Sequence, residues 1–221
     1  MASPARVMRA LRVPWEARPG SVMAAMLPAG RIPTDSIGAP FDALFGDRWP
    51  TRPTWIVAVD LDTGRRTVFG QAGEPVATPA EAVQASCAIP AYFEPIRIGG
   101  ARYVDGGVHS TTNADLAAAE RPDLVLVSAP MSAVSGAARV GLALPIRQVA
   151  RLSLGREVAR LRRLGLEVMT FQPTTADLEV MNGDALDPAK LGPVTTRAGE
   201  TTRLRLARAD VRARLAALSG R

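Results

Sequence analysis

The sequence predicts an α/β fold with a mainly parallel sheet, and three observations support this prediction. Short apolar runs typical of strands alternate with segments of helical spacing. The 221 residues are 47% hydrophobic and 22% charged, a balance typical of a globular chain with a sizeable core. No run of about 18 apolar residues, the length of a membrane-spanning helix, is present. Together these features exclude collagen-like, wholly disordered and membrane-spanning classes.

The first part of the chain is expected to hold little sheet. Residues 1–53 are rich in proline and glycine, which predicts loops with brief helical turns. Trp55–Leu61 is then a β-rich run, and a turn at 62–65 followed by Thr67–Phe69 predicts a hairpin. Thr78, with Glu81 three residues later, predicts an N-capped short helix that ends near residues 88–90.

The remainder of the chain alternates between short apolar runs typical of strands and segments with helical spacing of apolar residues. Residues 96–98 and 102–104 flank two glycines and predict a second small hairpin. A helix is expected at 113–120, and the continuous apolar run Leu124–Ser128 is typical of a buried parallel strand. A helix over 145–164, a strand at 167–171 and a final amphipathic helix complete the pattern. The apolar stripes expected on these two helices are Ile146, Val149, Leu152, Val158, Leu161 and Leu164 in the first, and Leu204, Val211, Leu215 and Leu218 in the second.

Arginine dominates the charge of the chain. The 27 basic residues outnumber the 21 acidic ones, and the segments 139–163 and 197–221 hold seven arginines each. Basic segments of this kind can contact the phosphates of lipids or nucleic acids. Nucleic acid is not an expected partner, because no aromatic residue lies among these arginines to stack on bases. A solvated helix face remains the other interpretation of both segments.

The most informative stretch is Ala85–Val108 (ASCAIPAYFEPIRIGGARYVDGGV). A short helix of small residues ends at Pro90, a bulky patch follows, and a hairpin then delivers Asp105 to the turn Gly106-Gly107. Two glycines directly after a carboxylate at a strand end allow positive φ and the close approach of another backbone segment. This arrangement can aim Asp105 at a neighbouring group, although a plain Asp-Gly turn has the same pattern.

The same stretch resembles the patatin-like phospholipase family, whose pattern is roughly A-S-x-A-x-P-x-x-F-x-P, a short strand and Y-x-D-G-G/A. The resemblance covers residues 54–130 well and the rest of the chain loosely. It implies a three-layer α/β/α domain, present here in incomplete form. The matching residues are Ala85-Ser86-Cys87-Ala88-Ile89-Pro90, Phe93, Pro95, Tyr103, Asp105, Gly106 and Gly107, with Ala58-Val59-Asp60-Leu61 and Thr63-Gly64 upstream and Asn113 downstream.

The resemblance also implies an activity. In this family a serine in Gly-x-Ser-x-Gly attacks a lipid ester, and the aspartate of the Asp-Gly-Gly motif accepts its proton. Here that aspartate is Asp105, with Gly106 and Gly107 completing the motif. A serine hydroxyl is a poor nucleophile until an adjacent base takes its proton, and backbone N–H groups must hold the developing oxyanion. The implied substrate is a lipid ester or phospholipid, and no cofactor or metal is required.

The nucleophile that this chemistry needs has no counterpart in the sequence. Neither Gly-x-Ser-x-Gly nor a glycine-rich oxyanion turn precedes residue 54. We therefore expect the C-terminal part of a patatin-like domain that starts after its nucleophile, either through a misassigned gene start or through a true truncation. Three serines in partly similar surroundings, Ser36, Ser86 and Ser153, are expected to be ordinary or structural.

Two further residues could suggest other chemistry. His109 follows Asp105 by four residues on the same turn, which argues against a Ser-His-Asp triad. As the only histidine it also excludes a zinc site built on two or three imidazoles. Cys87, the only cysteine, cannot form an internal disulfide and is expected to be a packed core thiol.

These features predict three segments and one activity. Residues 1–53 are expected to be a remnant of loops and short helices, residues 54–130 the patatin-like core, and residues 131–221 an Arg-rich helical part. The expected function is a lipid acyl ester hydrolase of the Ser-Asp dyad type, inactive as this chain alone. The alternative is a non-catalytic remnant that binds lipid or membrane surfaces through its Arg-rich helices. No apolar stretch follows the N-terminal arginines, so a cytoplasmic location is expected, with peripheral membrane contact.

Overall fold

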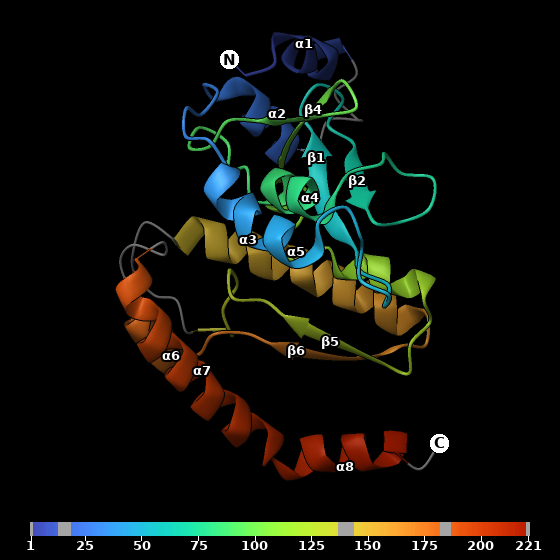
Figure 1. Cartoon of the computed structure of the whole chain (residues 1–221). Helices are drawn as coiled ribbons and strands as arrows, with labels where there is room; N and C mark the ends of the chain where they lie inside the picture. The colour runs from blue at the N-terminus through green and yellow to red at the C-terminus, as the bar shows by residue number, and fades with distance from the viewer. Residues whose placement is uncertain (1, 13–18, 137–143, 182–186, 220–221) are drawn as a thin grey trace. The chain divides into compact units, whose positions relative to one another are not determined.

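The computed structural model describes residues 2–12, 19–136, 144–181 and 187–219 (Figure 1). The chain divides into two compact units, residues 1–113 and 114–221. The mixed α/β class predicted from the sequence is confirmed. Residues 139–143, where the first basic segment begins, lie outside the described residues. No helix in the described ranges is long and apolar enough to cross a membrane.

A four-stranded antiparallel sheet forms the centre of the first unit, with the strand order β2-β1-β4-β3. Both predicted hairpins are confirmed, one by β1 and β2 and the other by β3 and β4. The two central strands pair so that Ala58 lies opposite Asp105. Asp105 is therefore the last residue of a central strand. The strand bounds are Ile56–Asp60 for β1, Arg66–Phe69 for β2, Ile96–Ile98 for β3 and Ala101–Asp105 for β4.

Helices cover both faces of this sheet. Successive side chains of a strand point to opposite faces, so each central strand packs against both helical layers. Ala58 and Tyr103 pack with Ala82 and Ala85 of α4, whereas Val59 and Val104 pack with N-terminal residues that include Ala25 of α2. The first unit thus has the three layers that the family resemblance implies. The helix bounds are Pro4–Arg12 for α1, Pro19–Met26 for α2, Asp35–Phe45 for α3 and Pro79–Ser86 for α4.

The short helix predicted after Thr78 is confirmed as α4, and the expected cap is present. The Thr78 hydroxyl accepts the backbone N–H of Glu81 (3.1 Å), and the Glu81 carboxylate accepts the backbone N–H of Thr78 (2.8 Å). This reciprocal capping box satisfies two N–H groups that a helix start otherwise leaves unpaired. The capping box stabilises α4, and Ala88, two residues beyond the end of this helix, accepts the backbone N–H of Asp105.

Residues 1–53 contain more regular helix than the sequence suggested. Instead of loops with brief turns, the described residues of this segment include α1, α2 and α3, of 9, 8 and 11 residues. Tertiary packing overrides the proline and glycine content, since Ala2 and Ala25 are buried against the sheet. The start of the chain is also held by the Ser3 hydroxyl, which donates to Asp62 Oδ1 (2.6 Å).

The second unit contains a two-stranded parallel sheet, β5 and β6, joined through the helix α5. Of the strand pairs described, only β5 and β6 are parallel, so the mainly parallel sheet predicted from the sequence is wrong for the four-stranded sheet of the first unit. Tight turns connect both hairpins of that sheet, and such turns join antiparallel strands. Val125, Val127 and Val168 pack on Leu154 and Leu161 of α5. The bounds are Leu124–Ser128 for β5, Leu144–Arg163 for α5 and Glu167–Phe171 for β6, and a 3₁₀ helix, Ala114–Ala119, replaces the helix predicted at 113–120.

The apolar stripes predicted for the C-terminal half are correct only in part. On α5, Val158 and Leu161 are buried, but Ile146, Val149, Leu152 and Leu164 are exposed. The predicted final helix is two helices, so Leu204 lies exposed on the first of them while Val211 is buried on the second. Neither glycine nor proline marks the break, which is why the sequence pattern missed it. The remaining bounds are Gly106–Val108 (η2), Thr175–Val180 (α6), Pro188–Lys190 (η4), Leu191–Leu206 (α7) and Ala209–Ser219 (α8).

Candidate functional site

The carboxylate of Asp105 lies where β4 ends and η2 begins. Its backbone N–H donates to Ala88 O (3.0 Å), which places the residues after α4 beside it. Its Oδ1 accepts the backbone N–H of Gly107 (2.6 Å), so Asp105 caps η2. A strand end, a helix end and a 3₁₀ turn therefore fix the position of this one side chain.

The surroundings of Asp105 favour its neutral form. Burial raises the pKa of Asp105, and the hydrogen bond from the Gly107 N–H opposes that rise without cancelling it. A carboxylate with a raised pKa is a stronger proton acceptor than a solvated one. Within the described residues, Oδ2 of Asp105 has no hydrogen bond, so this oxygen remains available to accept a proton from another group.

Gly106 is required by the close approach of two backbones. A Cβ atom built on Gly106 would lie 2.3 Å from Val57 O of β1, and one on Gly107 would lie 2.9 Å from Asp105 Oδ1. The close approach expected from the two glycines is therefore present. The positive φ that they also allow is not used, because neither glycine has a φ in the left-handed region. Steric room against β1, and not backbone conformation, excludes a side chain at position 106.

Asn113 holds the loop that follows the motif. Its Nδ2 donates to Ser110 O (2.6 Å) and to Gly106 O (3.4 Å), and its own backbone has a φ of 46°. Its Oδ1 accepts from Arg66 Nη1 (3.3 Å) and from Nδ1 of His109 (3.1 Å). Asparagine tolerates the left-handed region better than most residues. The sequence indicated Asn113 only through the family resemblance, and nothing in the sequence indicated Arg66.

His109 and Cys87 are both close to the motif. The ring of His109 is turned to Asn113, as its Nδ1 contact shows. Burial raises the pKa of Cys87, and the negative charge of Asp105 raises it further. A nucleophilic cysteine needs a lowered pKa, so the raised value argues against that role, whereas the thiol is half-buried and not in the core as predicted.

The three serines considered as nucleophiles occupy different elements. Ser36 is exposed in the first turn of α3, and Ser153 lies on α5 in the second unit. Ser86 is the last residue of α4, two residues before Ala88, whose carbonyl accepts the backbone N–H of Asp105. No group of three or more His, Cys, Asp or Glu side chains that could hold a metal occurs in the ranges that the structure describes.

Comparison with known proteins bears on one segment. Residues 20–118 match the family model described as patatin-like phospholipase. No curated protein matches the chain. The matched segment begins in α2 and contains all four strands of the first unit. It also contains the turn that carries Asp105, and Asn113, which holds the loop after that turn.

Proposed function

On the premise that residues 20–118 are a patatin-like phospholipase segment, a family of lipid hydrolases, we propose that Asp105 is the proton acceptor of a Ser-Asp dyad. The observation that carries the proposal is the state of its carboxylate. One oxygen is held by the Gly107 N–H, and burial raises the pKa. The Gly-x-Ser-x-Gly motif is absent from these 221 residues, so the proposed dyad requires a serine from outside them.

The proposed reaction is transfer of an acyl group from a lipid ester to water. Asp105 takes the serine proton as the serine oxygen bonds to the ester carbonyl carbon. The alcohol then leaves with that proton, and an acyl-serine remains. Asp105 next accepts a proton from water as the water attacks the acyl-serine, and it returns that proton to the serine oxygen. Backbone N–H groups must hold the oxyanion in both steps, and they too belong to the nucleophile-bearing segment.

The first test compares the 221-residue chain with an extended one. The DNA directly upstream of the Met1 codon should encode Gly-x-Ser-x-Gly in frame, and the extended chain should react with a fluorophosphonate probe. The 221-residue chain should neither turn over a short-chain nitrophenyl ester nor react with the probe. Stoichiometric labelling of the shorter chain at Ser36, Ser86 or Ser153 would show that the nucleophile is within it. A stop codon close upstream would favour the second candidate function.

The second candidate is non-catalytic binding to lipid surfaces, and the surface of α5 favours it. Arg151 and Arg156 are exposed on this helix beside the exposed side chains of Val149 and Leu152. A helix that exposes cations and apolar groups together can lie at the interface of an anionic membrane. Exposed arginines on α5 are compatible with both candidate functions, so binding to lipid must be measured separately from hydrolysis.

Binding to vesicles provides that measurement. If α5 meets anionic lipid, each surface arginine contributes about 1 kcal/mol, screened within a Debye length of about 10 Å at 0.1 M salt. Sedimentation with phosphatidylserine-containing vesicles is expected to be strong at low salt and to weaken steeply at high salt. Vesicles of phosphatidylcholine alone should bind little. Equal binding to both kinds of vesicle would contradict an electrostatic role for these arginines.

A further inference from the structure

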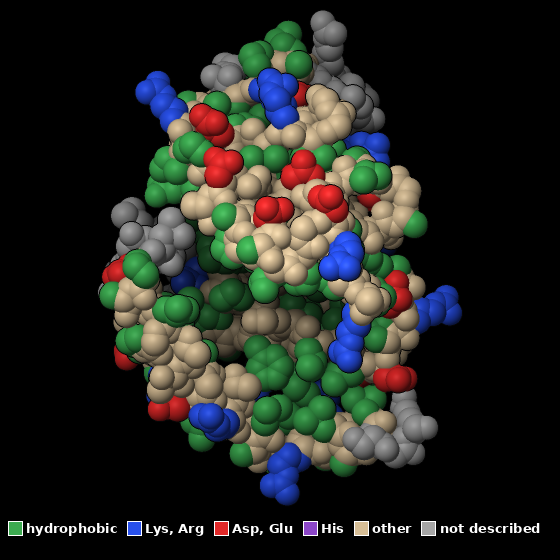
Figure 2. Space-filling view, viewed as in Figure 1, with side chains coloured by type: hydrophobic (Ala, Val, Ile, Leu, Met, Phe, Trp, Pro, Cys, Tyr) green, Lys and Arg blue, Asp and Glu red, His purple; other side chains and the backbone are tan. Residues whose placement is uncertain are grey.

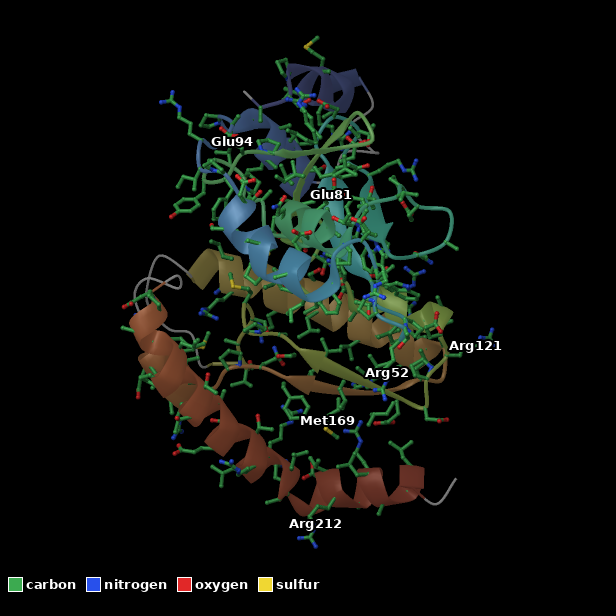
Figure 3. The ribbon with its side chains drawn as sticks, viewed as in Figure 1. Arg52, Glu81, Glu94, Arg121, Met169 and Arg212 are labelled. Carbon is green, nitrogen blue, oxygen red and sulfur yellow. The ribbon has the colours of Figure 1, made fainter. Side chains whose placement is uncertain are left out.

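A cavity of about 630 Å³ lies in the second unit, between the β5–β6 sheet and the helices α7 and α8. This volume is within the roughly 300–1,000 Å³ of ligand-binding pockets. Figure 2 shows hydrophobic side chains gathered between the sheet and these helices, and Figure 3 labels Met169 among them. The sheet contributes Met169 and Phe171, and the helices contribute Val194, Leu204 and Val211.

The helices around the cavity are held by specific contacts. Asp177 of α6 accepts from the Thr201 hydroxyl of α7 (2.7 Å) and from the Thr174 hydroxyl (2.6 Å). Although burial opposes ionisation, these hydrogen bonds keep the pKa of Asp177 below its usual value. Arg214 of α8 pairs with Glu167 of β6. The walls of the cavity are thus connected by polar contacts, while its surface is mainly apolar.

Four arginines and two aspartates line this space. Arg197 lies 3.8 Å from Asp177 and 3.0 Å from Glu200, and Arg208 lies 3.0 Å from Asp210. With Arg214 on Glu167, three of the four lining arginines have a carboxylate partner.

Arg205 differs from these three. Its guanidinium lies over the ring of Phe171, 5.2 Å from the centroid, and within the described ranges no carboxylate pairs with it. Its Nε, like that of Arg197, is buried and has no hydrogen-bond partner, but of these two only Arg197 has a carboxylate nearby in the described part of the chain. Arg205 as a whole is half-buried, but its buried Nε–H group lacks an acceptor, which is costly, and a ligand oxyanion would supply one.

We propose that this cavity binds a long-chain carboxylate, with the acyl chain along Met169, Leu204 and Val211 and the carboxylate on Arg205. The chemistry commits to this ligand because a long apolar wall is combined with one cation that lacks a carboxylate partner among the described residues. A peptide or a nucleotide would bring further polar groups, and the apolar wall offers few partners for them. The inference does not rest on the proposed function, because binding needs no nucleophile and Asp105 lies in the other unit.

The test uses the full chain and cis-parinarate, an 18-carbon carboxylate whose fluorescence rises in apolar surroundings. Parinarate is expected to bind in the 1:1 ratio of a single site, and its methyl ester more weakly. Arg205→Gln should raise the Kd for parinarate about 10- to 100-fold and leave that for the ester unchanged, as expected for loss of a charged hydrogen bond. The matched control is Arg212→Gln on α8, since the side chain of Arg212 points away from the sheet (Figure 3).

A second variant keeps the proposal testable if Arg205→Gln perturbs the fold. Ala198 lines the cavity from α7 about two helical turns from Arg205, and Ala198→Trp would fill part of it while keeping the Arg205 side chain itself. This variant should lose both parinarate and the ester while circular dichroism stays that of the wild type. Equal affinity for acid and ester, or unchanged binding in a folded Arg205→Gln protein, would overturn the proposal. The proposal would also be overturned if light scattering showed a dimer and that dimer did not bind parinarate, because a second copy of the chain would then occupy the space.

Discussion

Replacing Asp105 with asparagine in an extended chain that carries the nucleophile is expected to lower kcat/KM for ester hydrolysis about 10²- to 10⁴-fold. An amide of the same shape cannot accept the serine proton. Its Oδ1 can still accept the Gly107 N–H, so the turn at η2 should keep its geometry. Steady-state kinetics with a nitrophenyl ester, together with circular dichroism of both proteins, would separate loss of the base from loss of the fold.

Controls for this substitution are present in the same chain. Asp123 is exposed just before β5, and Asp123→Asn should leave activity unchanged. His109→Ala should also change the rate little. A fully active Asp105→Asn protein would exclude the dyad, and an inactive His109→Ala protein with an intact fold would favour a triad.

The raised pKa of Asp105 also predicts how kcat/KM depends on pH. Activity needs the ionised carboxylate, so kcat/KM of the wild type should fall on acidification at a higher pH than for an ordinary aspartate of pKa about 3.9. Because the pKa of Asp105 is raised by folding, the folded protein holds this proton up to a higher pH than the unfolded chain does. Ionisation of Asp105 therefore lowers the free energy of unfolding as the pH rises from the unfolded-state pKa to the folded-state pKa. Asp105→Asn removes this penalty, and its Tm at neutral pH should equal or exceed that of the wild type.

Substitution of Gly106 by alanine is expected to reduce the free energy of unfolding by about 3 kcal/mol or more, at the upper end of overpacking effects. The added methyl group would lie 2.3 Å from a β1 carbonyl, and a backbone atom in a central strand cannot turn away as a side chain can. Either β1 or η2 must move, and both position Asp105. Urea denaturation followed by circular dichroism measures the loss.

The matched control adds the same methyl group where space is open. Gly155 lies on α5 with no atom within 4 Å of a built Cβ and no positive φ. Gly155→Ala should therefore stabilise the chain by about 1 kcal/mol through helix propensity. Effects of equal sign and size for Gly106→Ala and Gly155→Ala would contradict the close approach at η2.

The sequence was informative where the interactions are local. The hairpin of β1 and β2 follows from a short turn at Thr63-Gly64 between β-rich runs, and α4 follows from Thr78 and Glu81 three residues apart. Each feature depends on residues that are close together in the chain, so the pattern can be recognised without tertiary information. The family resemblance then identified Asp105 as the candidate base.

Long-range contacts account for what the sequence did not predict. The reason for glycine at position 106 is the carbonyl of Val57, which is distant in the chain and is brought close only by β1–β4 pairing. Likewise, the space beside Arg205 exists only because α7 lies across from Phe171. The segment 1–53 was predicted as loops because the burial of Ala25 against the sheet has no local signal.

The parallel pairing of β5 and β6 has a consequence for the order of folding. The hairpin of β1 and β2 needs only the short turn after Asp60, but Ser128 and Glu167 are separated by the whole of α5. Closing a long loop costs more entropy before any contact forms, so non-local pairing is slow. During synthesis β5 leaves the ribosome before either α5 or β6 has fully emerged from it. The apolar side chains of Val125 and Val127 therefore stay open to other chains until those later residues have emerged, and the speed of translation through and beyond β6 sets how long that exposure lasts.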